Sequence, residues 1–322
     1  MKWGILGAAN IAKKALIPAL QRTETAEVFA VASLSGKEKD FAEEYHIPKT
    51  YSTYEGLLAD QEIEAVYIPL PNHLHKEWTI KAAQAGKHVL CEKPAALTTA
   101  DAKEMIETCE KHGVLFLEAF MYQFHPQHEK VKSLINEGAI GEVRLIKAGF
   151  SFNFDRNGYN IRLDRTKGGG ALWDVGCYGV HSALHLMDEE VDKVTAISHI
   201  DEESGVDFTT GVSLSLENGI IVQVDCSFEA EGRNEYQVIG SEGSINVHDA
   251  YRPDKQDHIG KITLRNEKGV QELIETGDQY RLQVEKFMEA AGQKDSLTEL
   301  HNETLRYLKV MEESIHLIYR GK

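Results

Sequence analysis

Cysteine, basic charge and long apolar runs are all scarce in this sequence of 322 residues. Its four cysteines lie far apart and form no CxxC pair, so neither a zinc knuckle nor a disulfide scaffold is expected. Because acidic residues outnumber basic ones, 51 to 35, binding to nucleic acid is not expected either. No apolar run could span a bilayer, and the N-terminus lacks the apolar core of a signal peptide, so we expect a cytoplasmic protein with no membrane contact.

The chain is longer than one hydrophobic core usually supports, and its content of 42% hydrophobic and 27% charged residues is that of a globular protein. We therefore expect two domains, residues 1–120 and residues 121–322. The helices at the C-terminal end could pack back on the first domain.

The first 120 residues alternate short β-branched runs with helical periodicity, which predicts a doubly wound α/β domain around a parallel sheet, the Rossmann arrangement. The expected strands are Trp3–Leu6, Val28–Ser33, Ala65–Leu70, His88–Cys91 and Val114–Ala119. The expected helices are Ile11–Arg22, His73–Ala85 and Thr99–His112.

Beyond residue 120 several strand-like runs follow one another with turn signals between them, which predicts an α+β domain with a mainly antiparallel, open sheet. Glu217, Asn218 and Gly219 form a strong hairpin signal, because asparagine and glycine accept the positive φ of primed turns. The expected strands are Gly149–Phe154, Lys193–His199, Thr209–Leu216, Ile220–Phe228 and Glu235–Ile239. Two helices are expected at Tyr280–Ala291 and Leu297–Tyr319.

A turn of small residues follows the first expected strand and opens the next helix. It is a relaxed form of the GxGxxG fingerprint, in which small side chains let the backbone approach a pyrophosphate. Small residues also mark ordinary helix packing, but the strand before and the helix after favour a dinucleotide site. The residues assigned to it are Gly7, Ala8, Ala9, Asn10 and Ile11.

The end of the second strand favours NADP over NAD. NAD enzymes usually place a carboxylate there for the ribose 2′-hydroxyl, whereas this chain has Ser33, Leu34, Ser35, Gly36 and Lys37. Hydroxyls and the Lys37 ammonium could bind a 2′-phosphate, although a solvated surface loop is the competing interpretation, and NAD remains possible.

Two motifs follow neighbouring strands, at the edge where open α/β sheets bind ligands: PLPNHLH at residues 69–75 and GKHVLCEKP at residues 86–94. Together with GAANIA, EAFMY at residues 118–122 and GGGALWDVGCY at residues 168–178, they closely resemble the family of glucose-fructose oxidoreductase and inositol dehydrogenase. The resemblance covers nearly the whole chain. Tyr178 is similar to the tyrosine of the dimeric dihydrodiol and xylose dehydrogenase subgroup, where inositol dehydrogenase has histidine.

The resemblance implies that Lys93 contacts substrate and nicotinamide, that Tyr178 exchanges the hydroxyl proton, and that Asp174 orients one of them. Chemistry agrees, because an ammonium favours the ionised form of a nearby phenol, whose ordinary pKa is about 10. Without the motifs, Lys93 would be interpreted as a solvated turn residue, Tyr178 as packing and Asp174 as a helix cap.

Further residues join the site by the same resemblance. His181 is expected beside the substrate with Lys93 and Tyr178. Leu34 and Gln123 stand where the subgroup often has arginine. His181 and His185 lie one turn apart as metal ligands might, but a third ligand of suitable spacing is missing, so no metal is expected. The remaining cofactor contacts are expected from Pro69, Leu70, Asn72, His75, Glu92, Lys93 and Arg162.

The sequence thus predicts an NAD(P)-dependent dehydrogenase or reductase of a sugar, polyol or trans-dihydrodiol. Two alternatives are a glycoside hydrolase that uses NAD transiently and a non-catalytic nucleotide-binding module. Relatives associate through the second-domain sheet, so the resemblance also implies a homodimer or a higher oligomer. Loops of the second domain are expected to set the substrate specificity.

Overall fold

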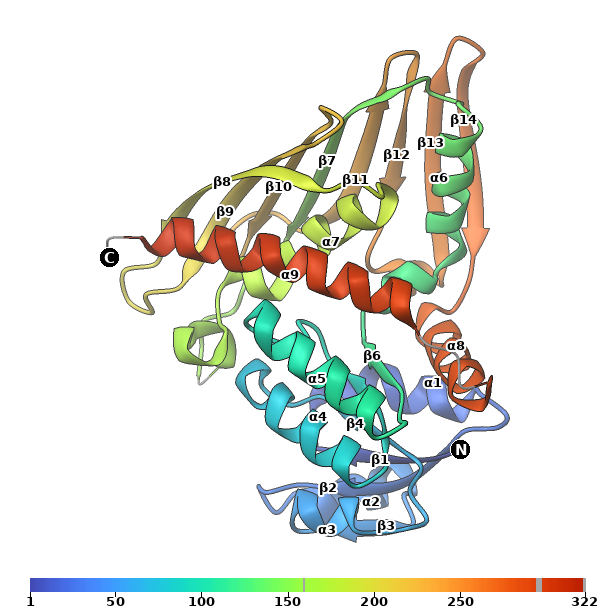
Figure 1. The fold of residues 1–322 in the computed structure, drawn as a ribbon, viewed down its shortest axis with the longest axis vertical. Helices are drawn as coiled ribbons and strands as arrows, with labels where there is room; N and C mark the ends of the chain where they lie inside the picture. The colour runs from blue at the N-terminus through green and yellow to red at the C-terminus, as the bar shows by residue number, and fades with distance from the viewer. Residues whose placement is uncertain (159, 294–296, 321–322) are drawn as a thin grey trace. The chain divides into compact units, whose positions relative to one another are not determined.

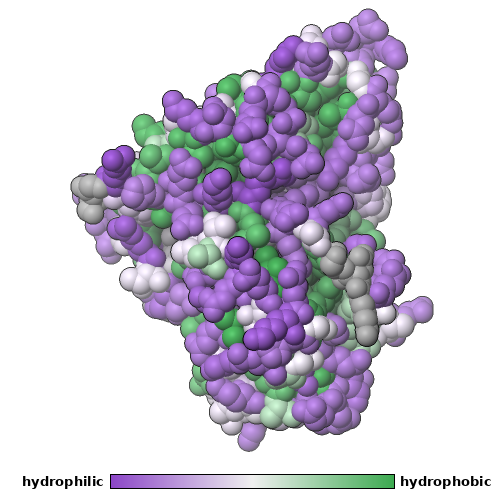
Figure 2. Space-filling model, in the orientation of Figure 1, coloured by the Kyte–Doolittle hydropathy of each residue, from purple (hydrophilic) through white to green (hydrophobic). Residues whose placement is uncertain are grey.

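The computed structural model describes residues 1–158, 160–293 and 297–320, which form two compact units (Figure 1). The first unit contains Met1–Met121 and Tyr280–Leu305, and the second contains Tyr122–Gln279 and the residues from Arg306 onward. The face drawn in Figure 2 is predominantly hydrophilic, as a net charge of -16 leads one to expect. Within the described residues, no helix combines the length and the apolar character that crossing a membrane requires.

The first unit is built on a parallel sheet of six strands in the order β3-β2-β1-β4-β5-β6. Strands β4 and β5 are apolar almost throughout because helices cover both faces of such a sheet. The doubly wound α/β fold is therefore confirmed. The strands are β1 (Lys2–Leu6), β2 (Glu27–Ala32), β3 (Lys49–Tyr51), β4 (Ala65–Ile68), β5 (His88–Cys91) and β6 (Phe116–Glu118).

Helices of the first unit come from both ends of the chain. A π-helical turn, Ala12–Leu16, leads into α1, and Trp3 of β1 packs on Phe287 of α8 with ring centroids 4.9 Å apart. The helices are α1 (Ile17–Gln21), α2 (Glu38–Tyr45), α3 (Tyr54–Leu58), α4 (His75–Gln84), α5 (Thr99–Lys111), α8 (Gln279–Gln293) and the first part of α9 (Thr298–Tyr319).

The second unit contains a sheet of eight strands in the order β14-β13-β12-β11-β7-β10-β9-β8. All neighbours are antiparallel except β7 and β10, which run parallel, so the prediction of a mainly antiparallel sheet is confirmed. The strands are β7 (Val143–Ser151), β8 (Val191–Ile200), β9 (Asp207–Leu216), β10 (Ile221–Ser227), β11 (Arg233–Gly240), β12 (Gly243–His248), β13 (Ile259–Asn266) and β14 (Gly269–Thr276).

The predicted hairpin joins β9 to β10, but its turn differs from the primed type. Gly219 has φ +86°, whereas Asn218 does not have positive φ. The Asn218 side chain accepts a hydrogen bond from the Ile220 amide at 3.1 Å, so asparagine contributes its side chain here.

Two helices pack on the second-unit sheet. Helix α6 (Pro126–Asn136) lies along β13 and β14, and α7 (Cys177–Leu186) lies against β7 and β10 (Figure 1). Glycine allows the close approach of α7, since a Cβ on Gly179 would lie 2.6 Å from Val224 Cγ1 and 3.3 Å from Ala148 Cβ. The position of α7 on the sheet thus depends on one missing methyl group.

A methyl group added to α7 tests this packing. Gly179→Ala is expected to destabilise the second unit by about 1–3 kcal/mol, because the sheet has no room for it. The matched control is Gly292→Ala in α8, where no atom lies within 4 Å of the added Cβ. That change should stabilise by roughly 0.5–1 kcal/mol, as alanine does in helices. Thermal unfolding of both variants is the measurement, and equal melting temperatures would contradict the packing argument.

Candidate functional site

Three adjacent strands of the first unit, β1, β4 and β5, end at the same edge of the sheet. The chain leaves them through Gly7, Pro69 and Glu92, and each begins a segment that the sequence assigned to the cofactor. This edge is where open parallel sheets bind their ligands. The fold thus brings three of the predicted cofactor segments to one edge.

The turn after β1 has the shape that a pyrophosphate requires. Gly7 has φ +109°, and a Cβ there would lie 3.1 Å from Leu70 Cδ2. Ala8 and Ala9 are half-buried and the helix begins at Asn10, which is exposed. The first amides of a helix have no intrahelical acceptor, so they are available to an anion. These residues fit a dinucleotide phosphate.

The loop after β2 carries the residues predicted to select the coenzyme. Ser33 is buried, and its Oγ lies 2.9 Å from Ser35 Oγ. Leu34 is 64% exposed. Lys37 is exposed at the start of α2 and makes no ion pair with any residue that the structure describes. The loop therefore exposes Ser35, one leucine and one available ammonium.

The turn after β5 carries Lys93, which is half-buried. Glu92 accepts hydrogen bonds from the buried Tyr67 hydroxyl and, at 3.3 Å, from the Lys93 amide. Burial and the Glu92 carboxylate both raise the pKa of Tyr67, so its proton stays on the phenol. The Lys93–Pro94 peptide bond is cis.

His75, at the start of α4, is completely buried. One ring nitrogen, Nδ1, lies 2.9 Å from Pro94 O, and the other, Nε2, lies 2.7 Å from Leu70 O. The imidazole therefore bridges the segments that follow β4 and β5. Burial lowers the pKa of His75, and the two carbonyls oppose that shift. A direct contact of this ring with the cofactor stays a prediction.

In the second unit, Arg162 and Asp174 form a two-pronged ion pair, with Nε at 2.6 Å from Oδ2 and Nη2 at 3.3 Å from Oδ1. The triple glycine explains their proximity. The Gly170 amide donates to Arg162 O at 2.9 Å, and a Cβ on Gly169 would lie 2.6 Å from that same oxygen. The chain folds back on the glycine run, and Arg162 is thereby brought to Asp174.

Asp174 is not a helix cap. It lies within a π-helical turn, Leu172–Gly176, that runs into α7. The carboxylate that accepts from the Leu172 amide, at 2.7 Å, belongs to Asp207 of β9. Asp207 is fully buried, and Thr210 Oγ1 and Tyr319 OH also donate to it at 3.0 and 3.3 Å. Burial raises the pKa of Asp207, and these donors oppose the shift.

Tyr178, one turn after Asp174, is 6% exposed and packs among three aromatic rings. Its ring centroid lies 5.3 Å from those of Phe150 and Tyr251 and 5.9 Å from that of Tyr122. The Arg162 charge also interacts with the Tyr178 phenol, which contributes to the raised pKa of Arg162 after the larger effect of Asp174. Sequence reasoning missed the three aromatic neighbours, because they come from distant segments.

His181 is buried, and its Nδ1 lies 2.6 Å from the Tyr122 hydroxyl. The His181 and His185 rings are stacked, with centroids 5.9 Å apart. Among the described residues, no group of three or more histidine, cysteine, aspartate or glutamate side chains could hold a metal ion. The four cysteines are free and buried. A contact between His181 and substrate stays a prediction.

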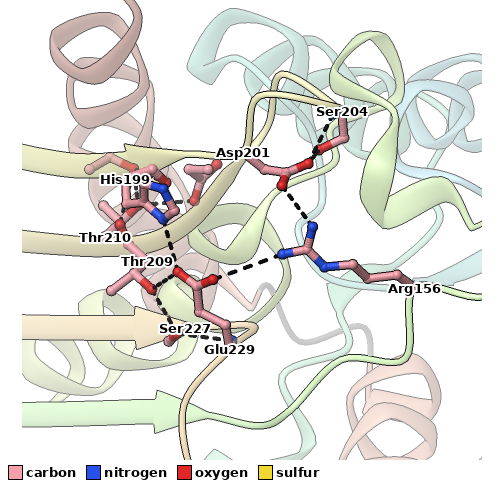
Figure 3. Close-up of polar contacts among 10 residues, drawn as sticks. Arg156, His199, Asp201, Ser204, Thr209, Thr210, Ser227 and Glu229 are labelled. Atoms are coloured by element: carbon pink, nitrogen blue, oxygen red, sulfur yellow. Dashed lines mark hydrogen bonds and ion pairs between the residues drawn. The ribbon is translucent and has the colours of Figure 1, made fainter.

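A second polar cluster anchors the segment that leads to Arg162 (Figure 3). Arg156 reaches Asp201 at 2.7 Å and Glu229 at 3.9 Å, and it lies over the Phe208 ring. His199 Nδ1 lies 2.9 Å from Glu229 Oε1, and this hydrogen bond lowers the pKa of Glu229. The cluster ties the chain after β7 to the strands β8, β9 and β10.

Comparison with known proteins shows the family of this chain. A family model described as "Oxidoreductase family, NAD-binding Rossmann fold" matches residues 1–120, and a "GFO/IDH/MocA C-terminal domain" matches residues 128–246. D-xylose 1-dehydrogenase (NADP(+)) 2 of Haloferax volcanii is 37% identical over 90% of this chain and 89% of its own. The chain belongs to the Gfo/Idh/MocA oxidoreductase family.

Another relative and one solved structure match most of this chain. Trans-1,2-dihydrobenzene-1,2-diol dehydrogenase of Xenopus tropicalis is 31% identical over 76% of this chain and 74% of its own. The structure of a 3-ketoreductase from Actinomadura kijaniata with NADP and TDP-benzene has a TM-score of 0.93. It is 28% identical and covers 99% of this chain and 98% of that one. The chain is thus an NAD(P)-dependent oxidoreductase that acts on CH–OH groups.

Proposed function

We propose that this enzyme moves a hydride between NADP and a hydroxyl-bearing or carbonyl carbon of a sugar, polyol or trans-dihydrodiol. Lys93 and Tyr178 are its catalytic residues. The observation that carries the proposal is the setting of Tyr178, a buried phenol held by three aromatic rings beside the Arg162 and Asp174 pair. A phenol held in one place next to a cation suits proton exchange more than packing.

The roles follow from the charges. NADP, when bound, supplies or accepts the hydride at its nicotinamide ring. In the oxidative direction Tyr178 takes the hydroxyl proton, and in the reductive direction it returns that proton to the new alkoxide oxygen. Lys93 donates a hydrogen bond to the substrate oxygen and favours the ionised phenol. Arg162 supplies a second positive charge near Tyr178, and its ion pair with Asp174 fixes the orientation of the guanidinium.

A homodimer through the outer face of the second-unit sheet is part of the proposal. Ile197 of β8 is 79% exposed on this face, beside a shallow hollow over Gly211 that Thr195, Ser213 and Gln223 also line. Apart from Asp225, the side chains around this exposed isoleucine are uncharged, which suits a contact with a second copy of the chain.

Substitution of the two catalytic residues tests the reaction. Lys93→Ala and Tyr178→Phe are each expected to lower kcat by about 100-fold or more, the usual contribution of a positioned proton donor. Reduced-nucleotide absorbance is followed with D-xylose, a trans-dihydrodiol and a TDP-linked sugar. Lys103→Ala is the control, since this lysine is exposed on α5. Full turnover by Tyr178→Phe would contradict the proposal, and nucleotide binding without turnover of any substrate would favour a non-catalytic binding module.

The role of the Arg162 charge is tested separately. Arg162→Met is expected to lower kcat by about 10-fold. It should also raise the apparent pKa in the part of the pH–rate profile that reports ionisation of Tyr178, because a cation that favours the phenolate is lost. Arg162→Lys should restore part of the pH profile but not the two-pronged geometry. The control is Arg165→Met, because Arg165 stacks on the Tyr319 ring at 3.8 Å. An unchanged pH–rate profile in Arg162→Met would refute this role.

The coenzyme preference is tested at Lys37. Lys37→Ala is expected to weaken NADPH binding by about 10-fold, or about 1.4 kcal/mol, and to leave NADH binding unchanged. Fluorescence titration with both nucleotides measures the two dissociation constants. Lys39→Ala, two residues along, is the matched control. Equal losses for NADPH and NADH would rule out a specific contact with the 2′-phosphate.

A further inference from the structure

Two buried side chains hold the backbone of the turn that carries Lys93. His75 Nδ1 is hydrogen-bonded to Pro94 O at 2.9 Å. The Ala95 amide donates to Glu118 Oε1 at 2.7 Å. Pro94 and Ala95 directly follow Lys93, so both hydrogen bonds act within two residues of the proposed catalytic ammonium.

Glu118 ends β6 and is 3% exposed. Its second oxygen, Oε2, accepts from Thr304 Oγ1 at 2.7 Å, and Thr304 is 4% exposed on α9. A buried carboxylate is costly unless hydrogen bonds replace the lost water. Because one oxygen receives the Ala95 amide and the other receives Thr304, the donor on α9 bears directly on how firmly the turn is held.

Helix α9 is itself fixed to the same strand. His301, three residues before Thr304, is bonded through Nε2 to Phe116 O of β6 at 2.9 Å. His301 and Thr304 of α9 thus bind the first and the last residue of β6, respectively. A residue 186 positions from Glu118 in sequence therefore completes the surroundings of its carboxylate.

We propose that Glu118, oriented by Thr304, is a positioning residue for Lys93. It fixes the Ala95 amide and thereby the direction from which the Lys93 ammonium approaches the substrate oxygen. This inference rests on the proposed function of Lys93. Glu118 touches neither substrate nor nicotinamide, and it acts through the backbone of the turn.

Thr304 offers a cleaner test than Glu118, since loss of a buried carboxylate could unfold the protein. Thr304→Val keeps the side-chain volume and removes the hydroxyl, which leaves Glu118 Oε2 without this donor. Thr304→Ser keeps the hydroxyl and is the rescue variant. Ser314→Ala is the matched control, because this buried hydroxyl on the same helix has no partner among the described residues.

The experiment measures hydrogen exchange of the segment 92–97 with NADPH present, together with kcat, NADPH dissociation constants and the pH–rate profile. Thr304→Val should speed exchange and lower kcat by about 10-fold, as expected for one lost hydrogen bond to a charged group. The apparent pKa of the tyrosine-dependent limb should move toward its ordinary value of about 10, because the ammonium is displaced. NADPH affinity should stay within about twofold, and Thr304→Ser and Ser314→Ala should match the parent enzyme.

Two results would overturn the inference while Lys93→Ala remains inactive. One is unchanged exchange in Thr304→Val, which would show that the hydroxyl does not hold the turn. The other is faster exchange with an unchanged kcat and pH profile, which would reduce Glu118 to a stabilising role. Full activity of Lys93→Ala would instead refute the proposed function, and the positioning role would be refuted with it.

Discussion

A carboxylate removed from water must receive hydrogen bonds from its surroundings, and each unit of this enzyme uses one such group to fix a functional segment. In the first unit Glu118 receives the Ala95 amide beside Lys93. In the second unit Asp207 receives the Leu172 amide at the start of the helical segment that carries Asp174 and Tyr178. Backbone placed in this way is rigid without occupying the space that a ligand needs.

The positions of the charged side chains near Tyr178 are likewise set by the backbone. The fold-back of the chain on Gly169 and Gly170 brings Arg162 to Asp174, so the guanidinium has a fixed direction. Aromatic rings surround the phenol on its other sides and exclude water from it. A cation near a shielded phenol interacts more strongly than it would in bulk solvent.

The sequence predicted elements that are long or strongly patterned, such as β5, β9 and the helix Thr99–Lys111. It missed β3, which has three residues, and the three last strands of the second-unit sheet, β12, β13 and β14. Exposed charges hide the alternation of β14. The strand that was expected to begin at Gly149 begins at Val143, where lysine and arginine interrupt the apolar pattern. Motifs made Lys93 and Tyr178 the catalytic candidates, a prediction that still awaits its test, whereas periodicity indicates only burial. It could not reveal that Tyr251 packs on Tyr178 or that Thr304 meets Glu118.

The division of the first unit between two distant stretches of chain has a consequence for synthesis. Residues 280–305 complete this unit. The contacts of Trp3 with Phe287 and of Glu118 with Thr304 therefore cannot form until most of the polypeptide has been synthesised. At the usual elongation rates that interval lasts roughly 10–40 s. During it the nascent unit exposes an apolar strand face, the kind of surface that chaperones bind, while water hydrates the Glu118 carboxylate. The first unit is therefore completed only near the end of translation.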